Sequence, residues 1–496
     1  MIRGKIKVDV SFLDDLENRL RLNQAPKVKD LVAAVSPKGI PRSLIFRYAN
    51  LLRRMGGSYN ALKLLNPIIR NSMQSPSNLE IIEYAACLTK LNLCDESIEL
   101  LNSVRDESSP ELHFERAAAY MTKWEYLFAR EHLHKFLACP AIPEYRRRVG
   151  ELNLGATYVH TNEPDKAIKI LEHLLSRAKK SRFHLLCGNA LELLGQAYVL
   201  KRDFPCATKL LNEASTYMGI SNPRYILYID KVRAMSQLLM ENNSKPAIRG
   251  LIALRSQAAN IRDWNTLRDI ELLSAIATND IKKIYDLYYG TPYPEYRKRI
   301  LAFWGKPLPL VISYEKFIGV KQDRPKNIFD ISKGLDLNSR HQLKVGKTLH
   351  RLIQCLTTDF YAPFSTTRIF SIVFRGVYFN PHTSRQQVYE AVKRLNQWFE
   401  NREIDLQVIR GYGGYRLRSK NGYILKVDGS MKIHSRLDDF LKLLLENSLT
   451  QNFSLRAVVE RLKLPGRSAS RMLTLATEHG LLIRHGSGRS TSYSIS

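Results

Sequence analysis

The sequence predicts a mainly α-helical protein, with an N-terminal array of repeated helices followed by two smaller α+β units. Three observations lead to this fold class. Small residues recur in the first part of the chain at separations of 36, 32, 38 and 40 residues. Five prolines and strand-forming residues interrupt the helical pattern between residues 290 and 326. Two later segments each end in a glycine-containing stretch typical of a β-hairpin.

Length and charge limit the choice of domains and partners. The chain has 496 residues, which is too many for one hydrophobic core. Its formal net charge is +29, and residues 301–496 hold 31 Lys and Arg against 15 Asp and Glu. Such an excess of positive charge suits a polyanion such as DNA, RNA or an anionic membrane surface. A soluble protein with a high isoelectric point and no such partner is the alternative.

Cysteine and apolar patterns indicate the compartment. The six cysteines form no C-x-x-C pair and lie near no histidine cluster, so neither a metal site nor a disulfide framework is expected. No cofactor motif is present either. The start lacks a long apolar segment, and the run "LAFWGKPLPLVISY" is broken by Lys306 and two prolines. We therefore expect a soluble, cytoplasmic protein without a membrane partner.

Residues 1–42 are expected to form a helical segment, and residues 43–304 a series of helix pairs. The first helix of each of five pairs carries a small residue, namely Ala49, Ala85, Ala117, Gly155 and Gly195. Twelve residues later comes a second small residue, namely Ala61, Ser97, Ala129, Ala167 and Ala207. Four residues further on there is always a leucine, namely Leu65, Leu101, Leu133, Leu171 and Leu211. Small residues at this spacing let two antiparallel helices cross closely, with the leucine packing one turn beyond.

This pattern resembles the tetratricopeptide repeat, which has a period of roughly 34 residues. The resemblance covers residues 43–219 well, whereas the following segment keeps the helical period and loses the small residues. It implies an α-solenoid whose concave surface binds a protein or peptide, or which self-associates, for example as a homodimer. An irregular helical bundle is the alternative.

Residues 305–326 are expected to form a linker, and residues 327–427 a compact unit with three helices. Their sequences are "SRHQLKVGKTLHRLIQCL", "STTRIFSIVFRG" and "SRQQVYEAVKRLNQWFE". The fragment "VGKTLH" is not a phosphate-binding loop, because His341 stands where that motif requires glycine.

On the third helix, with Ser384 as its expected cap, one face is apolar, namely Val388, Val392, Leu395 and Phe399. The other face carries groups that can read base edges in a major groove, although Glu390 is discordant among them.

The stretch "REIDLQVIRGYGGYRLRS" then reads as a β-hairpin with arginines spaced along it. Together, "FRGVYFNPHTSRQQVYEAVKRLNQWFE" and "RGYGGYRL" resemble the winged helix-turn-helix output domain of OmpR/PhoB-type response regulators. The resemblance implies base or phosphate contacts by Arg385, Gln386, Tyr389, Lys393 and Arg394. It implies contacts from the hairpin, or wing, by Arg410, Tyr412 and Arg416. The glycine turn is one residue longer than usual, and no receiver domain precedes it, so phosphoryl control is not implied. A solvated basic hairpin without a ligand is the alternative.

Residues 436–496 are expected to repeat the order of three helices and a hairpin with a different sequence pattern. The helices are "SRLDDFLKLLLEN", "SLRAVVERLKL" with Ser454 as cap, and "PGRSASRMLTLATEHGLL"; "IRHGSGRSTSYSIS" closes as a hairpin. This segment is similar to the winged helices of many small bacterial repressors. The similarity implies DNA contacts by Arg467, Ser468, Ser470, Arg471, Thr474, Arg484 and Arg489. Winged helices also serve as protein-docking modules, which is the alternative for this unit.

Taken together, these features favour a sequence-specific regulator of transcription that binds double-stranded DNA. Two linked basic units favour DNA more strongly than either unit does separately. RNA is a further possibility, and an interaction scaffold that uses its winged helices for protein docking is the main alternative. An enzyme is not expected, because the sequence shows no G-x-S-x-G, no H-E-x-x-H and no complete phosphate-binding loop.

Overall fold

The computed structural model describes most of the chain. The described residues are 8–21, 25–33, 35–36, 39–71, 75–218, 223–240, 245–306, 308, 313–319, 327–374, 377–411, 413–428, 440, 443–445, 447–478 and 482–495. Tyr412 and most of the helix expected at residues 435–447 therefore lie outside the described residues, as do the side chains of Ser468 and Arg489.

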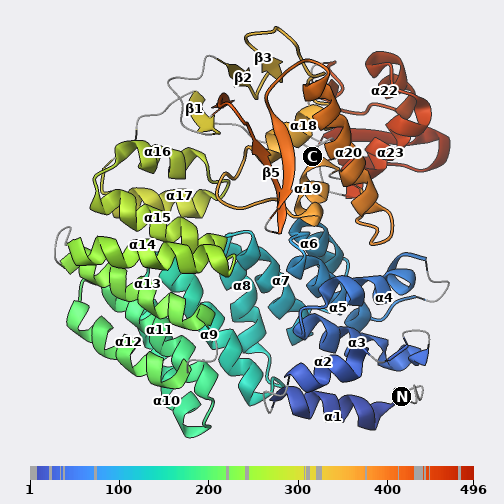
Figure 1. Cartoon of the computed structure of the whole chain (residues 1–496). Helices are drawn as coiled ribbons and strands as arrows, with labels where there is room; N and C mark the ends of the chain where they lie inside the picture. The colour runs from blue at the N-terminus through green and yellow to red at the C-terminus, as the bar shows by residue number, and fades with distance from the viewer. Residues whose placement is uncertain are drawn as a thin grey trace, which may run out of the picture.

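The described helices up to Trp304 follow one another along an arc, most of them as antiparallel pairs (Figure 1). Two helices precede the expected repeats, namely α1 (Val10–Arg21) and α2 (Ala25–Ala33). The five expected pairs are α3 (Arg42–Arg54) with α4 (Ser58–Asn71), α5 (Asn78–Lys90) with α6 (Cys94–Asn102), α7 (Pro110–Thr122) with α8 (Tyr126–Ala138), α9 (Glu144–His160) with α10 (Pro164–Lys180), and α11 (His184–Leu200) with α12 (Phe204–Met218). The array continues as α13 (Pro223–Met240), α14 (Lys245–Asn260), α15 (Trp264–Ala277), α16 (Ile281–Tyr289) and α17 (Pro294–Trp304).

The small residues lie where the two helices of a pair cross. All ten are buried, as are the five leucines that follow them. A methyl group at Gly155 would lie 2.5 Å from Leu171 Cδ2, and one at Gly195 would lie 2.7 Å from Leu211 Cδ2. Ser97 donates a hydrogen bond of 2.8 Å to the Ala85 carbonyl, twelve residues before it. The chain therefore contains tetratricopeptide-like repeats, and the spacing seen in the sequence is the spacing of these contacts.

The end of the array folds back onto its middle. Tyr293, just before α17, and Tyr296, within it, pack on Trp124 in the α7–α8 turn. The ring centroid of Trp124 lies 5.3 Å from that of Tyr293 and 5.2 Å from that of Tyr296. Tyr126 stacks on His160 at 4.7 Å, and Arg299 of α17 reaches the same histidine. These aromatic contacts hold α17 against turns that precede it by more than one hundred residues.

A mixed sheet and three helices form the next unit. The sheet has the order β1 (Ser313–Ile318), β6 (Tyr423–Asp428), β2 (Ile328–Asp330) and β3 (Leu335–Asp336). Strand β1 is antiparallel to β6, and β2 is parallel to β6. The segment expected to be a linker at residues 305–326 therefore contains a strand of this sheet. The short "VISYEKFI" run was too brief to distinguish a strand from a linker without its partner.

The first helix of this unit is shorter than expected. Helix α18 (Thr348–Leu356) begins nine residues after Ser339, where the sequence pattern placed the start. The preceding residues instead form a turn, in which Asp336 accepts hydrogen bonds from the backbone N–H and the hydroxyl of Ser339. Gly346 lies in a separate turn just before α18, and its φ of +72° is incompatible with a right-handed helix. Helices α19 (Thr366–Val373) and α20 (Ser384–Glu400) lie where they were expected.

This unit joins the two ends of the array (Figure 1). Its core is continuous with that of the first repeats, since Leu62 and Leu65 belong to the same buried cluster as Phe370 and Phe379. At the other end, Lys316 of β1 pairs with Asp286 of α16 at 2.6 Å. The Phe360 N–H also donates to the Gly290 carbonyl.

The last unit has a core of its own. It contains α22 (Leu455–Leu462), α23 (Gly466–Glu478) and a hairpin of β7 (Leu482–His485) and β8 (Ser492–Ile495). Ser454 caps α22 by accepting from the Ala457 N–H at 3.2 Å, as expected. In the described part of the chain, no helix combines the length and the apolar composition needed to cross a lipid bilayer.

Candidate nucleic-acid interface

Helix α20 presents a polar face to solvent. Val388, Val392, Leu395 and Phe399 are buried in the shared core, as the sequence pattern predicted. The five residues assigned to DNA contacts on this helix are all exposed, namely Arg385, Gln386, Tyr389, Lys393 and Arg394. Tyr389 keeps 52% of its surface exposed. The amphipathic pattern of the helix was enough to predict which of these residues are buried and which are exposed, because one face of the helix must pack against the core of the unit.

Some of these polar groups already interact within the helix. Gln386 donates from its amide to Glu390 at 2.8 Å, and Arg394 Nε contacts the Glu390 carbonyl at 3.3 Å. Glu390 thus takes up one amide hydrogen of Gln386. Lys393 makes no ion pair with any described residue, so its ammonium is available for an external anion.

The turn before α20 differs from the expected cap. Thr383 occupies the N-cap position and makes no side-chain capping bond. Ser384 is the first helical residue, is buried, and accepts from the Asn380 N–H at 2.8 Å. The expectation that Ser384 caps the helix is therefore wrong by one position, because its hydroxyl is used to close the preceding loop.

The hairpin consists of β4 (Gln407–Gly411) and β5 (Gly414–Arg418) and is fixed to α20. Asn396 of α20 bonds both backbone groups of Val408, at 2.7 and 3.0 Å. Arg410 pairs across the strands with Tyr415, and Ile409 pairs with Arg416. Because neighbouring residues of a strand point to opposite faces, Arg410 and Arg416 lie on different faces of the ribbon. Both are exposed, and Arg418 shares the face of Arg416.

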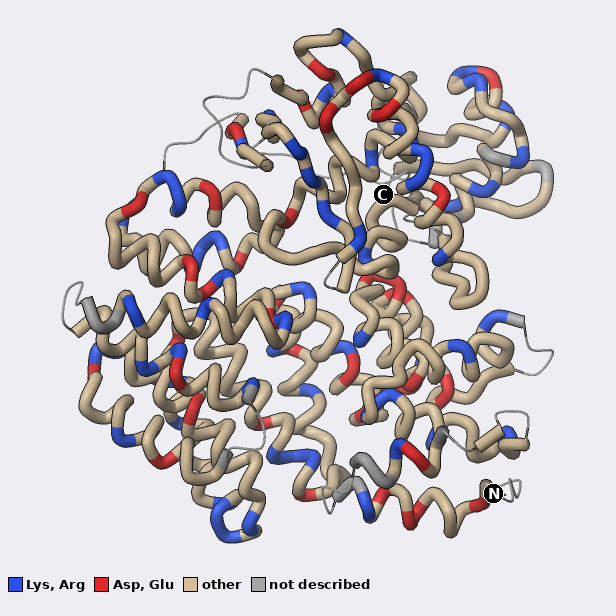
Figure 2. The backbone as a smooth tube through the Cα atoms, in the orientation of Figure 1, with Lys and Arg blue, Asp and Glu red and all other residues tan. Residues whose placement is uncertain are grey.

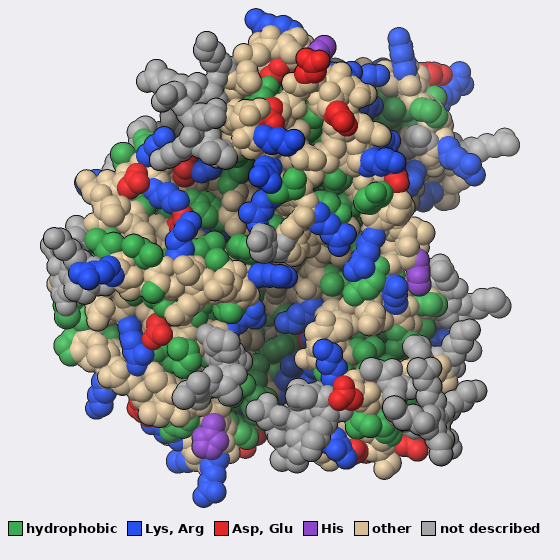
Figure 3. All heavy atoms as spheres, viewed as in Figure 1, with side chains coloured by type: hydrophobic (Ala, Val, Ile, Leu, Met, Phe, Trp, Pro, Cys, Tyr) green, Lys and Arg blue, Asp and Glu red, His purple; other side chains and the backbone are tan. Residues whose placement is uncertain are grey.

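Basic residues dominate this part of the surface. From Ser384 to Lys420 there are eight Lys and Arg against four Asp and Glu. Figure 2 shows them along the hairpin, and Figure 3 shows Lys and Arg side chains gathered over it and on the walls of the hollow below. A surface of this kind attracts a polyanion.

The start of α20 rests on the array. The guanidinium of Arg385 lies 3.4 Å from the ring centroid of Tyr59, and the Tyr59 hydroxyl donates to the Pro381 carbonyl. Glu96 of α6 accepts from the Phe379 N–H at 2.9 Å and pairs with Arg70 at 2.7 Å. Burial raises the pKa of Glu96 to about 7, while the Phe379 N–H and Arg70 oppose that rise by stabilising the carboxylate. The sequence carried no signal for this junction, whose hydrogen bonds join residues 283 and 322 positions apart.

A second junction is fully buried. Arg268 of α15 donates to both oxygens of Asp359 at 2.8 Å, and neither side chain is exposed. Arg368 of α19 contacts the same carboxylate at 3.3 Å. Burial opposes the charged form of Asp359, but Arg268 and Arg368 outweigh it and lower its pKa. Sequence reasoning missed all three residues, because nothing in the local pattern marks a charge as buried.

The last unit also exposes those of its assigned residues whose side chains the structure describes. On α23, Ala469, Leu473 and Ala476 are buried and Met472 is half-buried. Exposed on the same helix and on β7 are Arg467, Ser470, Arg471, Thr474 and Arg484. Thr474 donates to the Ser470 carbonyl, so its hydroxyl proton has an internal partner.

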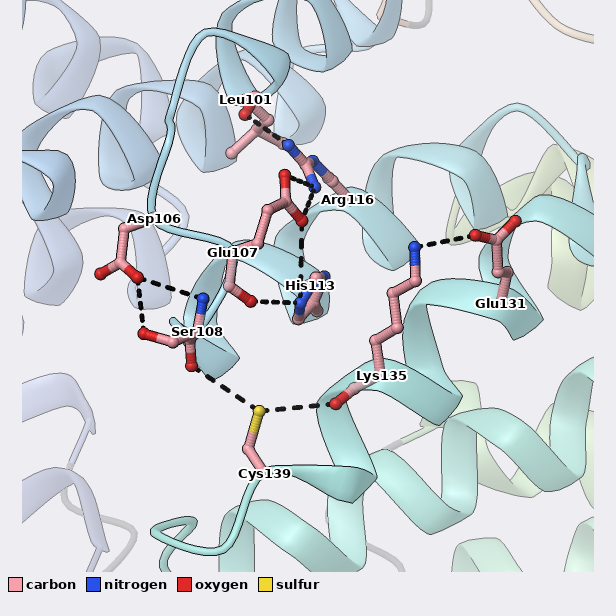
Figure 4. A network of polar contacts seen from close by, with 9 residues as sticks. All are labelled: Leu101, Asp106, Glu107, Ser108, His113, Arg116, Glu131, Lys135 and Cys139. Carbon is pink, nitrogen blue, oxygen red and sulfur yellow. Dashed lines mark hydrogen bonds and ion pairs between the residues drawn. The ribbon is translucent and has the colours of Figure 1, made fainter.

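Cavities in the array offer a different kind of surface. One of about 690 Å³ between α2, α3 and α4 has apolar walls, including Val32, Leu52 and Met55, with Lys29 and Lys63 among its lining residues. Another, near the α7–α8 pair, is lined by groups that already pair with each other (Figure 4). There Arg116 forms bonds of 2.8 and 2.7 Å to Glu107. That network holds the loop before α7 in place, and the guanidinium of Arg116 is already paired with Glu107 in it.

No known protein family and no curated protein matches the sequence. Among solved structures, the chain is similar to a putative kinesin light chain of nearly identical tetratricopeptide-like repeats from Podosopora anserina. The identity is 19%, over 35% of this chain and 92% of that one, with a TM-score of 0.30.

The apo form of RapI gives 14% identity over 56% and 84% of the two chains, with a TM-score of 0.39. A Rap protein complexed with competence and sporulation factor gives 15% over 58% and 87%, with a TM-score of 0.41. The repeat architecture of this chain rests on its own helix pairs and small-residue contacts, and these likenesses add no functional conclusion.

Proposed function

We propose that the protein binds double-stranded DNA in a sequence-specific manner and regulates transcription. The observation that carries the proposal is the exposed polar face of α20, whose opposite face is locked into the core while a basic hairpin is fixed beside it. A helix of this kind fits a major groove, where Arg, Lys and Gln recognise base edges, and flanking cations neutralise phosphates. The second unit, with Arg467 and Arg471 exposed on α23, supplies a further contact.

The experiment is selection of bound sequences from random duplexes with the full chain, followed by fluorescence anisotropy on the selected duplex. The full chain is required because β1 and the first repeats complete the fold of the α18–α20 unit. Arg394→Ala and Lys393→Ala should each weaken binding by about 1–3 kcal/mol, the usual size of one side chain to base pair contact. Arg471→Ala should weaken binding independently if α23 contacts the same duplex.

Lys209→Ala is the matched control, since it removes one exposed charge from α12 without touching the proposed interface. Affinity for duplex DNA should also fall steeply as the salt concentration rises. Unchanged affinity in the Lys393, Arg394 and Arg471 variants would defeat the assignment of these helices. Strong binding to single-stranded RNA with little binding to the duplex would move the proposal to a different nucleic acid.

A second candidate function is an interaction scaffold, in which the repeats hold a protein or peptide. The apolar cavity between α2, α3 and α4, with two lysines among its lining residues, favours an apolar segment that also carries acidic residues. Met55→Asp would place a carboxylate on the apolar wall and should abolish binding of such a peptide, as measured by isothermal titration with a panel of acidic amphipathic peptides. A scaffold of this kind would show little duplex binding at moderate salt.

A further inference from the structure

We propose that the helical array itself forms part of the DNA interface, through Lys63 on α4 and Arg262 in the α14–α15 turn. Both residues would contact the phosphate backbone, beside α20 and beside the tip of the β4–β5 hairpin respectively. This inference rests on the proposed DNA binding and extends it from the C-terminal units to the repeats, which were expected to bind a protein or peptide partner or to self-associate.

The first observation is a shared aromatic ring. Tyr59 has the Arg385 guanidinium at 3.4 Å from its ring centroid and the Lys63 ammonium at 5.1 Å. Arg385 belongs to α20 and Lys63 to the array, so the ring brings together cations from two parts of the molecule. Lys63 is exposed and makes no ion pair with any residue that the structure describes.

Two cations beside one ring repel each other. Each contact with the face of Tyr59 offsets the repulsion by only about 0.5–1 kcal/mol at an exposed site. A phosphate placed between the cations would replace the repulsion with two charge-assisted hydrogen bonds. A helix in the major groove is flanked by the phosphates of both strands, so a cation beside the first turn of α20 lies within reach of the backbone.

The second observation lies at the hairpin tip. Arg262 Nη1 lies 4.0 Å from the position that a Cβ atom would occupy on Gly413. Arg262 is exposed, and its φ of +58° places it in a left-handed conformation at the tip of the α14–α15 turn. The neighbouring Asp263 is engaged elsewhere, with Tyr228 and with the Thr266 N–H. Figure 2 shows the Lys and Arg residues of the hairpin running toward this part of the array.

The helical array lies beside α20 without covering its exposed polar face. Gln386, Tyr389 and Lys393 stay exposed although the turn before α20 is held by Tyr59 and Glu96. An autoinhibitory contact would bury these residues. The arrangement instead places one array cation beside α20 and another beside the hairpin, as expected of a composite interface.

The test measures the salt dependence of binding by full-length Lys63→Ala, Arg262→Ala and the double variant. The probes are the selected duplex and a scrambled duplex of the same length, between roughly 50 and 200 mM KCl, where phosphate contacts dominate the change in affinity. Each single variant should reduce the slope of log K against log salt by about 0.9, and the double variant by about twice that amount. Both duplexes should be weakened by the same factor, because phosphate contacts carry no sequence information.

Lys209→Ala again serves as the control and should leave the slope unchanged. Lys63→Arg should retain most of the slope, since it keeps the charge. A wild-type protein that binds DNA with the same slope as both alanine variants would overturn this inference and leave the proposed function intact. Tighter binding by Lys63→Ala would also overturn it, because the array would then oppose binding. Failure of the wild-type protein to bind any duplex would overturn both.

Discussion

At the scale of single residues, the fold depends on where a side chain is absent. Gly155 and Gly195 occupy helix interiors, where glycine costs about 1 kcal/mol relative to alanine. Their positions are explained by Leu171 and Leu211, whose side chains fill the space that a Cβ atom would need. The same logic makes Ala49, Ala85 and Ala117 small, and it is readable in the sequence because the crossing recurs at nearly the same interval.

Gly155→Ala should destabilise the protein by about 1–2 kcal/mol, because overpacking against buried Leu171 outweighs the gain in helix propensity. Gly250→Ala is the matched control, since a methyl group there meets no atom within 4 Å in the interior of α14. That variant should be stabilised by about 0.5–1 kcal/mol. Urea unfolding midpoints measure both effects, and equal responses of the two glycines would contradict the packing explanation.

At the scale of elements, buried polar groups decide how helices dock. Helix α17 is held on the middle of the array by Tyr293 and Tyr296, which pack on Trp124, and by Arg299, which contacts His160. Burial, together with the charge of Arg299, lowers the pKa of His160 from 6.5 to about 3. The folded protein therefore keeps this imidazole neutral under conditions in which the unfolded chain would protonate it.

This shift predicts a pH dependence of stability. Between pH 6.5 and 3 the unfolded state binds one more proton at His160 than the native state, so acidification favours unfolding. The stability that neutral His160 lends to the folded state is fully present above pH 6.5. It falls by up to about 1.4 kcal/mol for each pH unit between pH 6.5 and 3. His160→Gln should flatten the loss of thermal stability between pH 6.5 and 5, whereas the exposed His173→Gln should not. Parallel profiles for wild type and His160→Gln would contradict the assignment.

At the scale of the whole molecule, the α18–α20 unit closes the arc of the array. It shares a core with α3–α6 at one end, and at the other it meets α15 through the buried Arg268–Asp359 pair and α16 through the Lys316–Asp286 pair. This closure positions α20 and the hairpin relative to Lys63 and Arg262. Duplex binding and array stability should therefore be coupled, since the same contacts serve both.

Asp359→Asn should destabilise the protein more than Arg268→Met. The first change leaves fully buried Arg268 and half-buried Arg368 without their countercharge, which costs about 3–5 kcal/mol. The second leaves Asp359 paired with Arg368 and should cost less. Thermal unfolding of the two variants measures the order, and a larger loss in Arg268→Met would show that Arg368 does not compensate.

The sequence by itself determined the local features. It determined the helix pairs, the amphipathic faces of α20 and α23, and the hairpins, because each depends on residues within about forty positions of one another. Three local features departed from expectation, namely the role of Ser384, the conformation of residues 339–347 and the strand at Ser313–Ile318. The role of a hydroxyl, a turn or a short strand depends on the partner it meets, and that partner can lie far away in the sequence.

Only the tertiary structure decided that the array and the C-terminal unit share one core. The same holds for the burial of Arg268 with Asp359 and for the contact of Tyr59 with both Arg385 and Lys63. Such contacts leave no period in the sequence, because they occur once and join residues far apart. The physical reason is that periodicity records repeated burial, whereas a single long-range contact depends on how the whole chain closes.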